Sequence, residues 1–155
     1  MSFEVRAIGR IHSPYTFEKG NAPFQSGLKE SKKCSIEIFP EHTDRLEDLD
    51  SFRYIYVLYW LDHAKKPVKT KVSPPWVKDK TIGLFASRSP NRINPIGLSV
   101  IKIDQIQKNR IFTSNIDAFD KTPVIDIKPY IKDIDMKTDA NNGWLDQADR
   151  KMSKS

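Results

Sequence analysis

A run of ten residues, 52–61, constrains the fold more than any other stretch of the chain. It reads Phe-Arg-Tyr-Ile-Tyr-Val-Leu-Tyr-Trp-Leu, with few polar interruptions. Aromatic and β-branched side chains are enriched in strands, and a short continuous apolar run is typical of a buried one. We therefore predict a central strand here. The rings also fit a second interpretation, a platform on which unstacked bases would lie.

Short segments with strand-like residue patterns on both sides of this one indicate a mainly β chain. Further strands, each bounded by turn residues, are predicted at residues 5–12, 35–39, 81–86, 96–103, 111–116 and 124–130. About seven short strands with little helix predict a single small antiparallel β-barrel with one or two short helices. One helix is expected at residues 41–50, with Leu46 and Leu49 facing inward.

The length of 155 residues fits one domain with its own core. We expect the barrel domain to span residues 1–131 and a polar tail to follow at 132–155. Gly143-Trp144-Leu145 interrupts the polar character of this tail and would dock a short terminal helix.

The composition indicates the cellular location and the kind of binding partner to expect. Cys34 is the only cysteine, so no intramolecular disulfide is possible, which fits a reducing, cytoplasmic location. No apolar run approaches the roughly 20 residues that cross a bilayer, and the N-terminus lacks the layout of a signal peptide. The net charge of +6 favours an anionic partner, with nucleic acid first. The three histidines and Cys34 fall at no metal-ligand spacing, so we predict no metal.

Polar residues gather between two predicted strands, within residues 83–99. They are Arg88, Asn91, Arg92 and Asn94, interleaved with Pro90 and Pro95. Proline fixes φ and disfavours helix at the residue before it, so a rigid, irregular loop is expected. Two guanidinium groups on such a loop suit a polar or anionic ligand. The alternative is a solvated loop whose arginines pair with nearby carboxylates.

The loop at residues 62–80 carries six lysines around a lone Trp76. Lysines with an interleaved aromatic ring suit contact with a phosphate backbone and an unstacked base, and a solvated arm is the alternative. Asp62 and His63 open this loop. From the residues alone, they fit a strand-end pair that caps a turn better than a site pair.

Four blocks of the sequence resemble a known family. They are Ile8-Gly-Arg-Ile-His-Ser-Pro-Tyr15, Pro23-Phe24-Gln25, Phe85-Ala-Ser-Arg-Ser-Pro-Asn-Arg-Ile-Asn-Pro-Ile-Gly-Leu-Ser99, and Asp120-Lys-Thr-Pro123 with Asp126-Ile-Lys-Pro-Tyr130. Over residues 5–131 the chain resembles the TsaA-like (TrmO) family of S-adenosylmethionine-dependent tRNA methyltransferases. The resemblance implies a small β-barrel methyltransferase that forms a homodimer and holds its cofactor near the subunit interface. It also implies methylation of the N6 nitrogen of threonylcarbamoyladenosine, next to the anticodon of a threonine tRNA.

The resemblance also implies site residues. The cofactor, S-adenosylmethionine, would be contacted by Pro23, Phe24, Gln25, Asp62, His63, Arg88, Leu98, Asp120, Lys121, Thr122 and Pro123. If the substrate is RNA, its contacts would include Arg92, Asn94, Lys69 and Lys71. Asp126 or Tyr130 would help to remove the proton from the accepting nitrogen, which is a poor nucleophile. For Asp126 the alternative is a structural pairing with Lys128 or Arg92.

Three positions depart from the family pattern. Phe24 stands where the family carries arginine, Ile93 where it carries proline, and Lys121 where it carries glycine. Phe24 would either weaken cofactor or RNA binding or stack on the adenine. Longer relatives carry a C-terminal domain that has no counterpart in these residues. Two alternatives therefore stay open: a methyltransferase for a smaller substrate, and a non-catalytic module that binds S-adenosylmethionine or RNA.

Overall fold

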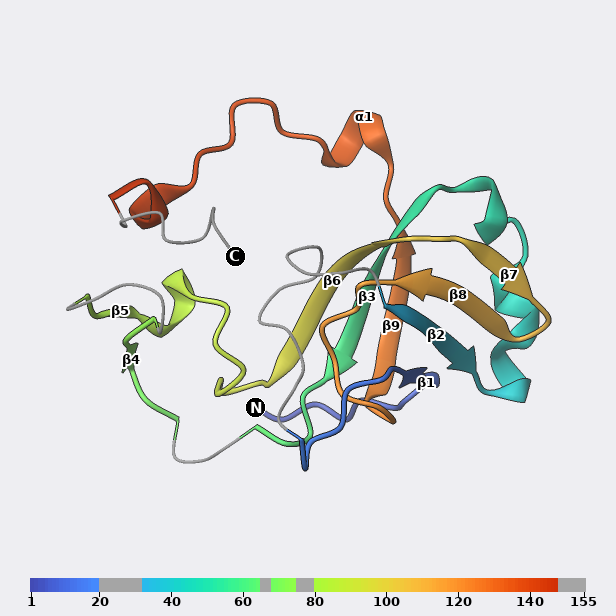
Figure 1. Ribbon diagram of the computed structural model, residues 1–155, viewed down its shortest axis with the longest axis horizontal. Coiled ribbons are helices and arrows are strands. Elements are labelled where there is room, and N and C mark those ends of the chain that lie inside the picture. The colour runs from blue at the N-terminus through green and yellow to red at the C-terminus, as the bar shows by residue number, and fades with distance from the viewer. Residues whose placement is uncertain (20–31, 65–67, 75–79, 148–155) are drawn as a thin grey trace.

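The computed structural model describes residues 1–19, 32–64, 68–74 and 80–147. A seven-stranded antiparallel sheet forms the body of the molecule, with the strand order β6-β3-β9-β1-β2-β8-β7 (Figure 1). Its strands are β1 Gly9–His12, β2 Lys33–Ile38, β3 Tyr54–Trp60, β6 Ile96–Lys102, β7 Gln105–Gln107, β8 Arg110–Ser114 and β9 Pro123–Pro129. A separate ladder joins β4, Lys71–Val72, to β5, Ile82–Gly83. The prediction of a mainly β chain is confirmed.

The helical segments within the described residues are short. They are η1 Pro40–Leu46, η2 Leu49–Ser51, η3 Leu84–Ala86, α1 Lys132–Asp135 and η4 Gly143–Gln147, of which all but α1 are 3-10 turns. The prediction of one helix at residues 41–50 is therefore wrong, because the segment forms two 3-10 turns instead. It breaks into η1 and η2 because Asp48 adopts a left-handed conformation, with φ of 62°. Leu46 and Leu49 still pack against the core, as predicted.

The run at residues 52–61 forms an interior strand, because β3 pairs with β6 on one side and β9 on the other. Its side chains alternate, so Ile55, Val57 and Tyr59 are buried while the residues between them face outward. The core is completed by branched aliphatic residues from the other strands and from the segment after β8, which include Ile11, Ile36, Ile101, Ile111, Ile116 and Val124. Burial of these side chains provides the main stabilisation of the sheet.

The predicted barrel is not closed, since β6 and β7 remain edge strands of the sheet. These two edges follow one another in the chain and are separated only by Ile103 and Asp104. The sheet curls there, because the Asp104 amide donates to the Phe112 carbonyl over 2.9 Å and the Thr113 hydroxyl to the Lys102 carbonyl over 2.7 Å. Within the described residues no strand ladder joins β6 to β8, so the sheet is strongly curved but open.

Two predicted strands are shorter than expected, and β7 had not been predicted. The strand expected at residues 81–86 ends at Gly83, because the Ser87 amide and hydroxyl both bond to the Leu84 carbonyl and close the turn η3. The strand expected at residues 5–12 begins at Gly9, since Val5 is exposed and does not join the core.

Over the described ranges, every helix falls short of the length and apolar character needed to cross a bilayer.

Close packing of β1 on β2 gives a test of the fold at Gly9. A Cβ atom at Gly9 would lie 2.3 Å from the carbonyl oxygen of Glu37, whereas one at Gly83 would meet nothing within 4 Å. We expect Gly9→Ala to lower the free energy of unfolding by about 1–3 kcal/mol, because backbone cannot move aside as a side chain can. Gly83→Ala, the matched control, should leave it unchanged or slightly higher. Urea unfolding measures both, and equal midpoints would contradict the packing described.

Candidate functional site

The ends of β1 and β3 meet the turn that precedes β9 at one end of the sheet. The amide of Asp120 donates to the Tyr15 carbonyl over 2.7 Å, and the amide of Lys121 to the Ile11 carbonyl over 2.8 Å. In return, the Ile11 amide donates to the carbonyl of Thr122 over 2.9 Å. The predicted cofactor segment, residues 120–123, is therefore fixed on the end of β1, and Thr122 is buried there.

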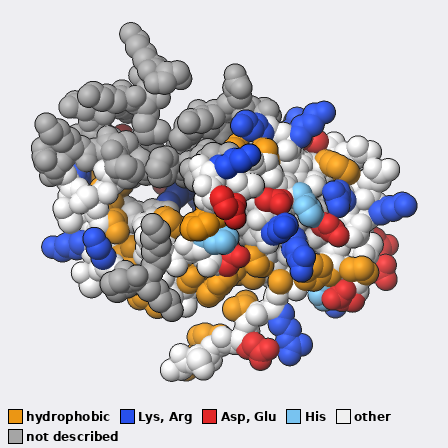
Figure 2. Space-filling view, turned by 60° about the horizontal axis from the view of Figure 1, so that its bottom comes forward, with side chains coloured by type: hydrophobic (Ala, Val, Ile, Leu, Met, Phe, Trp, Pro, Cys, Tyr) orange, Lys and Arg blue, Asp and Glu red, His pale blue; other side chains and the backbone are white. Residues whose placement is uncertain are grey.

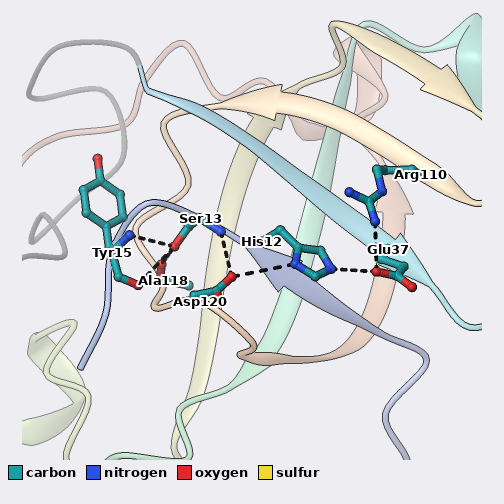
Figure 3. A network of polar contacts seen from close by, with 7 residues as sticks. All are labelled: His12, Ser13, Tyr15, Glu37, Arg110, Ala118 and Asp120. Carbon is teal, nitrogen blue, oxygen red and sulfur yellow. Dashed lines mark hydrogen bonds and ion pairs between the residues drawn. The ribbon is translucent and has the colours of Figure 1, made fainter. Parts of the chain in front are cut away.

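A polar network extends from this turn across β1 and β2 to β8 (Figure 3). The Asp120 Oδ1 atom accepts the Ser13 amide over 3.2 Å and lies 3.7 Å from Nδ1 of His12. On the other side of the ring, His12 Nε2 lies 2.7 Å from Oε2 of Glu37, which also meets Arg110 over 3.1 Å. His12 thus bridges two carboxylates, one in the predicted cofactor segment and one on β2.

This network lowers the pKa of Glu37 below its ordinary value of 4.5. The hydrogen bond from His12 is the largest cause, and the charges of His12, Arg110 and Arg10 add to it against a smaller opposing effect of desolvation.

On the face shown in Figure 2, acidic and basic side chains are interspersed around histidine rings. The positive net charge is therefore not gathered into one basic surface on that face.

An aromatic cluster places Asp62 and His63 beside the same turn. The His63 ring stacks on Phe17, with centroids 4.2 Å apart, and meets the edge of Phe119 at 5.9 Å. Phe119 directly precedes Asp120, so the segment after β3 and the turn before β9 share one cluster. Phe17 and Phe119 had not been singled out from the sequence. Their nearness to the matched blocks, two residues after Tyr15 and one before Asp120, was the available signal.

A polar triad of the buried Tyr59 and Ser99 hydroxyls and the half-buried Asp117 carboxylate had also been missed. The carboxylate of Asp117 accepts the Ser99 hydroxyl over 2.6 Å and the Tyr59 hydroxyl over 3.0 Å. Burial raises the pKa of Tyr59, and the nearby charge of Asp117 raises it further. Gly97 makes room for the Tyr59 ring, because a Cβ atom there would lie 2.1 Å from a ring carbon. The triad ties β3 and β6 to the turn.

The two arginines of the 83–99 segment have different surroundings. The Arg92 guanidinium donates to the Ser87 carbonyl over 2.8 Å and lies 5.9 Å from the centre of the Phe85 ring. Arg92 had been predicted to contact RNA, but its guanidinium already bonds to the backbone of its own loop. Arg88 is exposed and forms no hydrogen bond or ion pair within the described residues. None of the described residues therefore occupies its guanidinium.

The remaining predicted residues lie apart from the turn. Asp126 pairs with Lys128 over 2.8 Å, which is the structural alternative considered for it. Tyr130 packs against Tyr56, with ring centroids 5.5 Å apart, and Leu98 is 58% exposed on the outer face of β6. Three more predicted RNA contacts, Lys69, Lys71 and Asn94, are exposed. Pro23, Phe24, Gln25 and Trp76 lie outside the described residues.

Neither of two surface hollows joins Arg88 to the Asp120 turn. Two shallow surface hollows, of about 350 and 330 Å³, lie at the turns between β6, β7 and β8, and none of the predicted site residues lines either. The link between the two regions is instead the backbone, where the Leu61 amide donates to the Pro95 carbonyl over 2.7 Å. Among the described residues, no group of three or more His, Cys, Asp or Glu side chains could hold a metal ion.

Lys121 shows why one departure from the family pattern matters. Its φ is 67°, in the left-handed region that glycine adopts freely. A side chain there costs about 1–2 kcal/mol, which explains the glycine of the family pattern and makes Lys121 a strained substitute.

The lowered pKa of Glu37 predicts a pH dependence of stability. Because the folded-state pKa lies below 4.5, the stabilising contribution is present above that pH and is lost as the pH falls through the folded-state value. We expect the difference in unfolding free energy between the wild type and Glu37→Gln to shrink below pH 4.5. Urea unfolding from pH 7 to pH 3 measures it, with Glu41→Gln as the exposed control. A constant difference over that range would rule out the network's contribution.

Comparison with known proteins places this site in a family. The family model described as the tRNA-methyltransferase O N-terminal domain matches residues 10–136. A probable S-adenosyl-L-methionine-binding protein of Pyrococcus abyssi is 34% identical over 150 residues, which cover 97% of this chain and 80% of that protein. The tRNA (adenine(37)-N6)-methyltransferase of Rattus norvegicus is 34% identical over 134 residues, covering 83% of this chain and 31% of the rat protein.

A solved structure agrees with these relatives. The crystal structure of TrmO from P. aeruginosa superposes with a TM-score of 0.75 at 32% identity, and the match covers 94% of this chain and 62% of that one. This chain therefore spans less than two thirds of that protein. Because the family model covers most of the chain, we conclude that this protein belongs to the tRNA-methyltransferase O family through its N-terminal domain.

Proposed function

We propose that this protein is an S-adenosylmethionine-dependent methyltransferase that modifies the N6 nitrogen of adenosine 37 in a tRNA. The observation that carries the proposal is the meeting of two predicted cofactor segments: Asp62 with His63, and the Asp120 turn. They are tied by the Phe17–His63–Phe119 cluster and by the hydrogen bonds to Asp117. The names of the relatives supply the chemistry, since one is a probable S-adenosyl-L-methionine-binding protein and another a tRNA (adenine(37)-N6)-methyltransferase.

The described contacts limit how the turn would recognise the cofactor. The amides of Asp120, Lys121 and Thr122 all donate within the protein, to the carbonyls of Tyr15, Ile11 and Phe119. Recognition of the cofactor by this turn would therefore use its carbonyl groups and side chains rather than its amides. The sulfonium of S-adenosylmethionine is a cation, so a carboxylate such as Asp62 suits it. Arg88 suits the carboxylate of the cofactor or a substrate phosphate.

Catalysis would rest mainly on positioning. Methyl transfer needs the accepting nitrogen in line with the sulfonium methyl group at near-contact distance, and holding two reactants in that geometry lowers the barrier substantially. Asp126 and Tyr130 remain our candidates for removing the proton from the nitrogen. The Lys128 ammonium, 2.8 Å from Asp126, would have to release the carboxylate before it could accept that proton.

A homodimer would complete the site. The outer face of the edge strand β6 exposes Ile96, Leu98 and Val100 by 39, 58 and 43%. On β3 their cross-strand neighbours are Trp60, Leu58 and Tyr56, so an apolar strip crosses two strands. An exposed apolar strip on an unpaired edge is typical of an interface. Leu98, a predicted cofactor contact, lies in its middle, which fits a cofactor held near the boundary between two subunits.

The dimer is tested by placing a charge in this strip. We expect the wild type to sediment as a dimer at micromolar concentrations and Leu98→Asp to sediment as a monomer, because a carboxylate would have to be desolvated in the interface. Gln107→Asp, on the opposite edge strand β7, introduces the same charge elsewhere and should remain dimeric. A monomeric wild type, or a dimeric Leu98→Asp, would contradict the proposed interface.

The methyl transfer is tested directly with labelled S-adenosylmethionine and total tRNA. We expect label in a tRNA nucleoside, identified by mass spectrometry as N6-methylated threonylcarbamoyladenosine. We also expect at least tenfold lower kcat/KM for Arg88→Ala, because a charge-assisted contact to an anionic group is lost. Arg53→Ala is the control, since Arg53 is exposed just before β3, at the opposite end of that strand from Asp62 and His63. A labelled N6-methyladenosine without the threonylcarbamoyl group would correct the substrate but not the reaction.

The same experiment decides between this proposal and a non-catalytic binding module. The relative from Pyrococcus abyssi is named for binding S-adenosylmethionine, not for transferring its methyl group. Binding of the cofactor in calorimetry without labelled product from any RNA would favour that second function. Turnover in the absence of RNA would favour a smaller substrate.

A further inference from the structure

The segment after β9 returns to the arm that carries η3. From the end of β9 the chain runs through α1 to η4, which lies on the same side of the molecule as β5 and η3 (Figure 1). There the indole nitrogen of Trp144 donates to the carbonyl of Ala86 over 2.8 Å, across 58 residues of sequence. Ala86 ends η3 and lies two residues before Arg88. The contact therefore joins the tail to the base of the Arg88 loop.

The tail is shaped locally to present this indole. Gly143 has φ of 56°, so the chain turns there at little cost, and its amide donates to the Asn141 side chain over 3.2 Å. Asn142 donates to Asp146 over 2.9 Å and closes the turn η4 around Trp144. The Trp144 ring is half-buried, and the ammonium of Lys80 lies 5.8 Å from its centre, within reach of a cation–π contact.

Arg92 holds the same loop from within. Its guanidinium donates to the Ser87 carbonyl over 2.8 Å and reaches the Leu84 carbonyl at 3.5 Å. The two carbonyls directly before Arg88, those of Ala86 and Ser87, are thus each bound by a side chain, one from the tail and one from the loop itself. The Arg88 guanidinium itself has no partner within the described residues. A fixed backbone under a cation that no described residue engages would reduce the entropy lost when an anionic ligand binds.

We propose that Trp144 is a positioning residue, and that the tail is a strap that holds the Arg88 loop ready for its anionic ligand. The inference rests on the proposed function only in taking the ligand of Arg88 to be the carboxylate of S-adenosylmethionine. It extends the site to a residue outside 10–136, the range that the family model matches.

The first test measures whether the strap holds the loop, without any ligand. Trypsin cleaves after arginine, so the rate of cleavage after Arg88, followed by mass spectrometry, reports how often the loop opens. Trp144→Phe keeps an aromatic ring for Lys80 and removes the indole N–H together with the five-membered ring that carries it. We expect its cleavage after Arg88 to be about threefold to tenfold faster than in the wild type, the equivalent of one lost hydrogen bond. Cleavage after Lys108, in the β7–β8 turn, is the internal control and should not change. Equal rates after Arg88 would overturn the proposal.

The second test asks whether Trp144 acts through Arg88. We expect Trp144→Phe to weaken S-adenosylmethionine binding in calorimetry by about threefold to tenfold. In the Arg88→Ala background the same change should have no further effect, because the group that it positions is gone. Ile134→Ala, an exposed tail residue, is the control for nonspecific effects of changing the tail.

The outcomes separate this inference from the proposed function. Additive effects of Trp144→Phe and Arg88→Ala would show that Trp144 does not act through Arg88, and would overturn the positioning role. If the wild type binds no S-adenosylmethionine, the proposed function fails, and the trypsin comparison alone decides whether the strap exists.

Discussion

The hydrogen bonds that Tyr59 and Ser99 donate to Asp117 hold the candidate site on the sheet. They join β3, β6 and the segment before β9, and each of these leads within a few residues to a predicted cofactor contact. A hydrogen bond to a charged group contributes about 1.5–3 kcal/mol, and a buried hydroxyl left without a partner costs about as much. Because both hydroxyls bond to one oxygen of Asp117 and lie 3.0 Å from each other, the loss of either would disturb the other. The geometry of the site thus depends on the core beneath it.

The surface of the site combines fixed and free groups. In the turn at residues 120–123, the backbone amides already donate hydrogen bonds within the protein, and His12 bridges Asp120 to Glu37. The Arg92 guanidinium likewise donates its hydrogen bonds to carbonyls of its own loop. What remains for a ligand are a few side chains on a rigid backbone, chiefly Arg88 and the exposed ends of Asp62 and Lys121. Such a division lets binding energy be used for orientation, which is what methyl transfer requires.

Several contacts that shape the site cross long distances in the sequence, and these could not be predicted. Tyr59 and Asp117 are 58 residues apart, and Trp144 is 58 residues from Ala86. Nothing in the local sequence around Asp117 marks it as a buried acceptor, because its partners are set by the register of β3 and β6. The two arginines of the 83–99 segment also look alike in the sequence. Their roles differ because η3 presents carbonyls within reach of Arg92 and not of Arg88.

The sequence by itself determined the strand content, the interior position of residues 52–61, and the family, because propensity, apolar periodicity and motif identity are local properties of the chain. It also indicated that residues 120–123 belong to the site. Only the tertiary structure decided that the sheet stays open between β6 and β8, that the acidic segment at residues 41–50 breaks at Asp48, and that Asp126 pairs with Lys128. These outcomes depend on strand register and on side-chain packing between distant segments, which the order of residues does not display.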